Sequence, residues 1–237
     1  MIKHIPNLFT LANLFCGCIA TVLLFDNEIN IYLVALIVFT GIVFDFLDGF
    51  FARKFNIQSK LGLELDSLAD LITSGLVPGI IIFRLFNFPN DLTFSIISNE
   101  WFGYFAFIIT ISSAYRLAKF NIQENYKSYF SGLPVPANTI LILSLLLIFD
   151  TSNDEFIVDI ITNDFLLTAV VLISSFLMNS NYKFISLKFD DYEFNRLNNS
   201  RYFIILCSII LFFTMSYISI PIIFVIYFLI SFLAFRN

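Results

Sequence analysis

The sequence predicts an all-α integral membrane protein, and three of its features support this fold class. Of the 237 residues, 59% are hydrophobic and only 13% are charged, which is typical of a chain embedded in a bilayer. The apolar residues gather in long runs, most of them near the ~17–25 residues that a helix needs to cross a membrane. Neither a long polar linker nor a repeat of ~20–50 residues divides the chain, so we expect one membrane domain over residues 1–237.

About eight transmembrane helices are expected from these runs. The fifth, sixth and eighth runs are short, and only a few residues around Ser219 and Pro221 separate the last two, which form either a helical hairpin or one broken helix. Residues 181–201 mix aromatic and charged side chains, as expected for a cytoplasmic loop or for an amphipathic helix at the membrane interface. The eight runs are 8–25, 31–53, 65–86, 101–120, 134–149, 164–179, 202–219 and 221–235.

The distribution of charge predicts the orientation. If the chain starts inside, every Lys and Arg except Arg84 falls on the inner side, and the outer loops carry acidic residues such as Asp26 and Asp154. Because cytoplasmic loops of membrane proteins are enriched in Lys and Arg, we expect an inner-membrane protein with both termini on the cytoplasmic side. A single His and three Cys in apolar runs exclude a zinc site and a disulfide framework.

Four carboxylates within or against these apolar runs are the strongest functional signal. Asp45 and Asp48 are three residues apart and Asp66 and Asp70 are four apart, so each pair falls on one face of a helix. Carboxylates are costly inside a membrane, and four that face one another repel unless cations lie between them. Hard oxygen ligands suit Mg²⁺, Mn²⁺ or Ca²⁺, and two such ions can clamp a transferring phosphoryl group. A buried polar network that only holds helices together is the alternative.

The residues around these carboxylates follow the pattern D-x2-D-G-x2-A-R-x8-G-x3-D-x3-D. This pattern resembles the signature of the CDP-alcohol phosphotransferase superfamily, with every position filled. The resemblance implies a catalytic six-helix core over 1–180 and two further C-terminal helices within 202–237. It also implies metal ligands at Asp45, Asp48, Asp66 and Asp70, and a general base at Asp70. Small and basic positions of the motif are expected to bind nucleotide and phosphate: Gly49, Ala52, Arg53 and Gly62.

Two flanking stretches narrow the resemblance. Residues 5–18, IPNLFTLANLFCGC, are similar to the first helix of bacterial and archaeal phosphatidylserine synthases, which implies nucleotide contacts for Asn7 and Thr10; helix capping is the alternative. Residues 115–136 end in the Gly-Leu-Pro-x-Pro turn of the same enzymes, although Lys119 stands where they usually have Arg. Acceptor-binding residues are therefore expected at Arg116, Lys119, Gly132 and Pro134; membrane anchoring is the alternative for the two cations.

The function implied by the resemblance is transfer of the phosphatidyl group from CDP-diacylglycerol to L-serine, giving phosphatidylserine and CMP, with Mg²⁺ or Mn²⁺ and two ions expected. The metal motif leaves glycerol 3-phosphate or an inositol phosphate open as acceptors. A divalent-cation transporter is a remote alternative, because such a protein would carry charge near the midplane of several spans, often in symmetric halves. The expected partners are the two substrates and membrane lipids, with no nucleic acid, and a homodimer is allowed.

Overall fold

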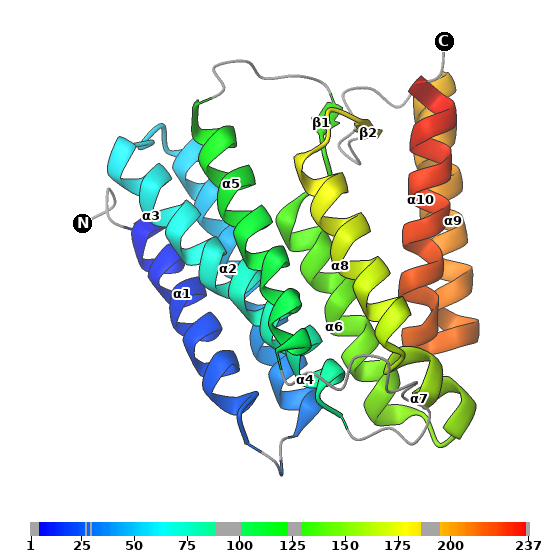
Figure 1. The fold of residues 1–237 in the computed structure, drawn as a ribbon. Helices are drawn as coiled ribbons and strands as arrows, with labels where there is room; N and C mark the ends of the chain where they lie inside the picture. Colours follow the sequence, from blue (N-terminus) through cyan, green and yellow to red (C-terminus); the bar gives the residue numbers. More distant parts are fainter. Residues whose placement is uncertain are drawn as a thin grey trace.

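The computed structural model describes residues 5–26, 28, 30–88, 101–122, 129–185 and 195–235, and it is helical except for one short pair of strands (Figure 1). The described α-helices are α1 Ile5–Leu23, α2 Ile31–Lys54, α3 Lys60–Asp70, α4 Val77–Phe86, α5 Ile108–Ile122, α6 Val135–Thr151, α7 Glu155–Ile161, α8 Asp164–Asn179, α9 Arg196–Met215 and α10 Ser219–Phe235. A π-helix, Leu71–Leu76, joins α3 to α4, and 3-10 helices occupy Phe102–Phe107 and Ser216–Ile218. The strands are β1 Tyr129–Ser131 and β2 Lys183–Ile185.

These helices form eight passes along the molecule, because α3 continues through the π-helix into α4 and α7 leads into α8. Four helical stretches in the described part of the chain are long and apolar enough to cross a membrane. The bent pair α7 and α8, with 47° between them, makes a fifth, and α6 is a shorter apolar helix. The predicted all-α membrane fold is confirmed.

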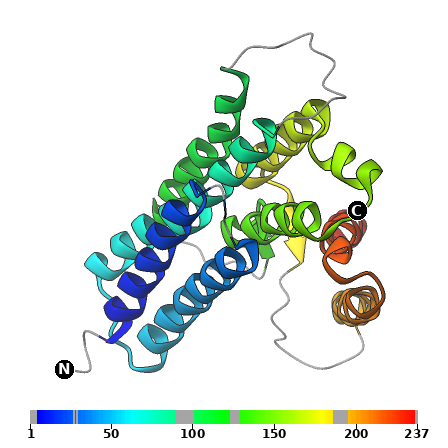
Figure 2. The ribbon, with the colours of Figure 1, turned by 90° about the horizontal axis from the view of Figure 1, so that it is seen from below.

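Helix α6 lies at the centre of the bundle. Figure 2 shows it between α2, α8 and α10, and it packs against each of them and against α4. Its side chains Ile142 and Leu146 are fully buried, as are Val38 on α2 and Leu167 on α8. Burying such side chains stabilises a fold by about 1.5–3 kcal/mol each where water is the alternative, but within lipid their contribution comes mainly from close packing.

The π-helix after Asp70 has a local cause. Pro78 has no N–H, so it cannot bond the carbonyl of Ser74 one turn earlier. The hydroxyl of Thr139 on α6 donates to that carbonyl instead, at 2.9 Å. Thr110 on α5 donates to the next carbonyl, that of Gly75, at 3.0 Å. The widened turn is therefore fixed by two neighbouring helices, directly below the last carboxylate of the motif.

Small residues let α1 and α2 approach the π-helix closely. A Cβ added at Gly17 would come within 2.4 Å of the Thr73 hydroxyl oxygen, and one at Gly41 would come within 2.9 Å of the Thr73 methyl group. The Thr73 hydroxyl also donates to the carbonyl of Asn13 at 2.9 Å. These contacts hold α1, α2 and the π-helix in one fixed arrangement.

The C-terminal helices form a hairpin. Helices α9 and α10 run side by side in both views, and Ser216 turns the chain between them with a φ of 48° (Figures 1 and 2). Of the two alternatives for the last two spans, the hairpin is correct. Residues 181–201 fit neither of their alternatives over the whole segment: Lys183–Ile185 is a strand and α9 already begins at Arg196, whereas 186–194 lie outside the described residues.

Strand β2 pairs with β1 in an antiparallel ladder, with Ser131 opposite Lys183. No strand was predicted here from the sequence. Three-residue strands are too short to show an alternating pattern, and their partner lies about fifty residues away in the chain.

Charges separate between the two ends of the bundle. The end of α2, the start of α3 and the end of α5 lie at one end, and they carry Arg53, Lys54, Lys60 and Lys119. Arg84 is at the other end, where its guanidinium donates to the carbonyls of Leu24 and Asp26 at 2.6 and 2.8 Å. Arg84 therefore caps the C-terminal end of α1, which explains the one cation that departs from the charge pattern.

Candidate metal and phosphate site

The chain bends between α2 and α3 in a way that brings the carboxylate pairs together. Asn56 takes a φ of 54°, and the N–H of Ile57 donates to the carbonyl of Ala52 at 3.0 Å, which closes the end of α2. The Ser59 hydroxyl then accepts from the N–H of Gly62 at 3.0 Å and caps the start of α3. This bend sets α3 against the last turns of α2.

Three of the four carboxylates form one cluster. Asp45, Asp48 and Asp66 each present an oxygen, and the three oxygens lie within 4.8 Å of one another. Asp70 does not belong to this group of three, although it lies one turn further along α3 and is buried, with 7% of its surface exposed.

Helix α1 supports the cluster from the side. The hydroxyl oxygen of Thr10 lies 2.5 Å from Asp48 Oδ2, to which it donates. The amide nitrogen of Asn13 donates to Asp70 Oδ1 at 3.0 Å. Both polar side chains are buried, Thr10 with 2% and Asn13 with 0% of its surface exposed. Each bond fixes one oxygen of a carboxylate and so aims the other oxygen of that group.

One oxygen of the cluster has no hydrogen-bond partner. Asp66 Oδ1 is buried, and no donor in the described part of the chain reaches it. An unpaired buried carboxylate oxygen is costly, and a cation between facing carboxylates removes that cost. Three clustered carboxylates with an orphaned oxygen fit a hard divalent cation such as Mg²⁺ or Mn²⁺, which prefers oxygen ligands.

The basic and small residues of the motif lie beside the cluster. The Arg53 guanidinium folds back over Gly49, so that a Cβ at Gly49 would be 3.1 Å from Arg53 Nη1. A Cβ at Gly62 would be 3.3 Å from Asn7 Oδ1, which brings the start of α1 to the start of α3. Asn7, Gly49, Arg53 and Gly62 therefore surround the same end of the bundle as the carboxylates, and their binding of nucleotide and phosphate stays a prediction.

Replacing Gly49 by alanine is expected to weaken substrate binding while the protein remains folded. The added methyl group meets only the flexible end of the Arg53 side chain, so folding should be unaffected. It displaces the guanidinium that is expected to contact phosphate, so we expect the Michaelis constant for a nucleotide-linked lipid to rise roughly tenfold. Unchanged kinetics of purified Gly49→Ala, with an unchanged melting temperature, would show that this surface does not bind the substrate.

The expected acceptor residues meet at a second place. Arg116 Nε donates to the carbonyl of Met178 at 3.1 Å, and its Nη2 donates to the carbonyl of Gly132 at 3.4 Å. Gly132 has a φ of +74°, and Pro134 caps the start of α6, as the sequence indicated for this turn. Arg116 and Lys119 line a small hollow together with residues of β1 and α8, and no residue of α2 or α3 contributes to that lining.

Sequence reasoning missed several side chains that position the site. Asn13 binds Asp70, and Ser67 on α3 shares hydrogen bonds with Asn121 on α5, at 2.9 and 3.2 Å. A signal for Asn13 was present in α1, whose buried residues repeat every three or four positions: Pro6, Thr10, Asn13, Gly17 and Ala20. An Asn on such a stripe is a buried polar group that needs a partner.

Clustered carboxylates beside an arginine, on antiparallel apolar helices, are a set of side chains that could hold a divalent cation and a phosphate group. The sequence model for CDP-alcohol phosphatidyltransferases matches residues 3–182, so the chain belongs to this family. The matched region covers α1 to α8 and ends just before the strand β2. Membership of an enzyme family removes the cation-transporter alternative.

Several curated proteins are similar to this chain in sequence. The chain is 35% identical over 135 residues to a CDP-diacylglycerol–serine O-phosphatidyltransferase of Bacillus subtilis, a match that covers 56% of this chain and 70% of the relative. It is 30% identical over 185 residues to the enzyme of that name in Helicobacter pylori, covering 77% and 72%. An archaetidylserine synthase of Methanothermobacter thermautotrophicus is 28% identical over 149 residues, covering 60% and 58%.

Proposed function

We propose that this enzyme transfers the phosphatidyl group of CDP-diacylglycerol to L-serine, which gives phosphatidylserine and CMP. The observation that carries this proposal is the carboxylate cluster of the family motif, with its unpaired Asp66 oxygen, in a chain whose curated relatives are named for serine transfer. The same chemistry with glycerol 3-phosphate or an inositol phosphate is the alternative.

The site would hold divalent metal, Mg²⁺ or Mn²⁺, through Asp45, Asp48 and Asp66, with Asp70 adding to the metal site; two ions are proposed. Metal held by these residues would supply the positive charge that offsets the diphosphate and the departing CMP. Arg53 is proposed to bind a phosphate oxygen through its planar fork of donors. Asn7 and Thr10 are proposed to border the nucleotide, since both lie on the first turns of α1 beside the motif.

Asp70 is the proposed general base. Its Oδ1 accepts from Asn13, which leaves Oδ2 to take the proton of the serine hydroxyl. The serine oxygen then bonds to the phosphorus that carries the diacylglycerol, and the bond from that phosphorus to the CMP oxygen breaks. The carboxylate of Asp70 is held in place by a fully buried amide, so the base is oriented before the acceptor arrives.

The test of this proposal is the choice of acceptor. Purified protein with CDP-diacylglycerol and Mn²⁺ is given L-serine, glycerol 3-phosphate or inositol phosphate in turn, and CMP release is measured. We expect release with serine and at most a trace with the other two. If CMP release depended on glycerol 3-phosphate or inositol phosphate instead, that compound and not serine would be the acceptor. The chemistry of the family would be unaffected.

Arg116 is proposed to contribute to binding of the serine carboxylate, with Lys119 beside it and the start of α6 at Pro134 nearby. Replacing Arg116 by alanine is then expected to raise the Michaelis constant for serine roughly tenfold or more, with little change in that for CDP-diacylglycerol. Arg116→Lys, which keeps the charge but loses the fork, serves as the matched variant. Equal effects on both substrates would assign Arg116 to the nucleotide lipid.

The carboxylate end of the bundle is proposed to face the cytoplasm, because the described basic residues gather there. In a variant without its native cysteines, a membrane-impermeant thiol reagent added outside should label Asn153→Cys and spare Gln58→Cys. Both positions are exposed and lie at opposite ends of the bundle. The reverse pattern of labelling would invert the orientation.

A further inference from the structure

The C-terminal hairpin of α9 and α10 lies beyond the residues that the family model matches, and hydrogen bonds join it to the strand β2. The hydroxyl of Tyr227 donates to the carbonyl of Ile185 at 2.9 Å. The N–H of the same residue, Ile185, donates to the Ser231 hydroxyl oxygen at 3.3 Å. Tyr227 and Ser231 are four residues apart, so one face of α10 binds both polar groups of a single strand residue.

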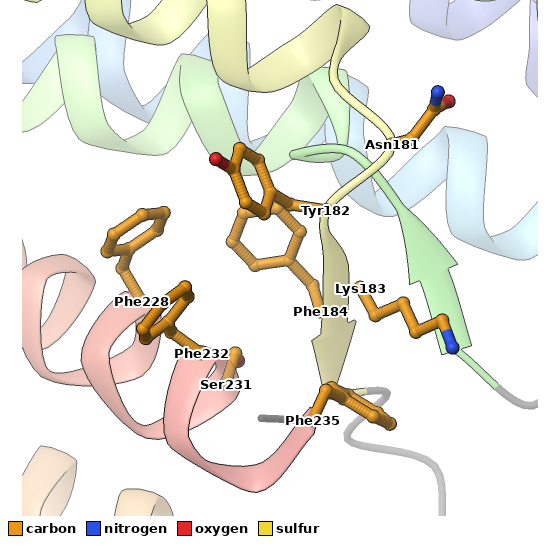
Figure 3. Close-up of a pocket in the computed structure, with 8 residues that line it drawn as sticks. All are labelled: Asn181, Tyr182, Lys183, Phe184, Phe228, Ser231, Phe232 and Phe235. Atoms are coloured by element: carbon orange, nitrogen blue, oxygen red, sulfur yellow. The ribbon is translucent and has the colours of Figure 1, made fainter. Parts of the chain in front are cut away.

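Aromatic packing strengthens this contact. Phe184 is 2% exposed, and its ring stacks on that of Tyr227 with 5.7 Å between the ring centroids. Its ring also lies 6.0 Å from that of Phe228. Figure 3 shows β2 running beside the last turns of α10, with Phe184 facing Phe228 and Ser231 between the helix and the strand. Hydrogen bonds and ring contacts therefore together join the hairpin to β2.

From β2 the contacts continue to the proposed acceptor residues. β2 pairs with β1, and directly after β1 the N–H of Gly132 donates to the carbonyl of Tyr182 at 2.9 Å. The carbonyl of Gly132 accepts from Arg116. A continuous series of contacts thus connects α10 to the guanidinium of Arg116 through Ile185, the strand pair and Gly132.

We propose that Tyr227 and Ser231 are positioning residues for the acceptor: they hold the strand pair, which in turn holds the Gly132 turn and Arg116 in the geometry that binds the serine carboxylate. The proposal rests on the proposed serine transfer. Neither residue touches the carboxylate cluster. Loss of their hydrogen bonds to Ile185 should therefore weaken acceptor binding and leave the metal and nucleotide chemistry unchanged.

The test compares Tyr227→Phe and Ser231→Ala with the wild type in the full-length purified protein. Tyr227→Phe keeps the ring and removes only the hydroxyl. One net hydrogen bond corresponds to roughly a three- to tenfold change. We expect the Michaelis constant for serine to rise by roughly that factor, with kcat and the constant for CDP-diacylglycerol unchanged. Tyr217→Phe, the same change at the opposite end of the hairpin, is the matched control and should behave as wild type.

Amide hydrogen exchange gives a readout that does not depend on turnover. In both variants, exchange should become roughly three- to tenfold faster in peptides that cover 129–133 and 183–185, and stay unchanged in α2 and α3. Wild-type exchange and wild-type serine kinetics in both variants would overturn the proposal, and so would an equal loss toward both substrates. If the wild type does not use serine at all, the proposed function fails, whereas the exchange data still decide whether the hairpin holds the strands.

Discussion

Replacing Asp66 by asparagine is expected to lower kcat at least about 100-fold without unfolding the protein. Asp66 contributes an oxygen to the three-carboxylate cluster, and its Oδ1 is buried without a hydrogen-bond partner. The amide has nearly the same shape but lacks the charge that holds a divalent ion. Removal of the negative charge also relieves repulsion from Asp45, so the variant should unfold no more easily than the wild type.

The measurement is CMP release at saturating and at limiting Mn²⁺, together with the melting temperature in detergent. Asp45→Asn and Asp48→Asn should show the same loss, and Asp70→Asn should lose turnover through loss of the base. Glu64→Gln is the matched control, because Glu64 is exposed on the same helix. Turnover close to wild type for Asp66→Asn at limiting metal would disprove a metal site shared by α2 and α3.

The second large effect is expected on stability, from Gly132→Ala. Gly132 has a φ of +74°, a conformation that costs a residue with a Cβ about 1–3 kcal/mol. The new Cβ would also lie 2.4 Å from the backbone carbonyl oxygen of Met178, which cannot move aside as a side-chain tip would. Such overpacking adds about 1–3 kcal/mol, so the turn between β1 and α6 should be displaced or the protein should fail to fold.

Unfolding in detergent and the Michaelis constant for serine together check this expectation. Gly62→Ala is a milder control, since its Cβ would meet the Ser59 and Asn7 side-chain oxygens at 3.1 and 3.3 Å and no backbone atom. A melting temperature of Gly132→Ala equal to that of wild type, with unchanged use of serine, would mean that the turn has room for a side chain and that its geometry does not matter for the acceptor.

The sequence predicted the membrane fold and the central cluster because both depend on local patterns. Runs of apolar residues give spans directly, and the spacing of Asp45, Asp48 and Asp66 places their side chains on facing helix surfaces. For the same reason the Gly-Leu-Pro-x-Pro turn was located correctly before α6.

Other features depend on contacts between distant segments, which local patterns do not report. The pairing of β1 with β2 joins two three-residue strands far apart in the sequence. The hydrogen bonds from Asn13 to Asp70 and from Thr139 to the Ser74 carbonyl each connect separate helices. The hydrogen bonds that Arg116 donates to the backbone carbonyls of Met178 and Gly132 also connect segments far apart in the chain.

Binding of Mn²⁺ to the purified protein tests the central claim most directly, because it measures the metal site without relying on turnover. Titration followed by electron paramagnetic resonance should show two bound ions in the wild type, and loss of tight binding in the double variant Asp45→Asn, Asp66→Asn. Glu64→Gln should bind as the wild type does. Tight binding that persists unchanged in the double variant would contradict a divalent-metal centre on α2 and α3.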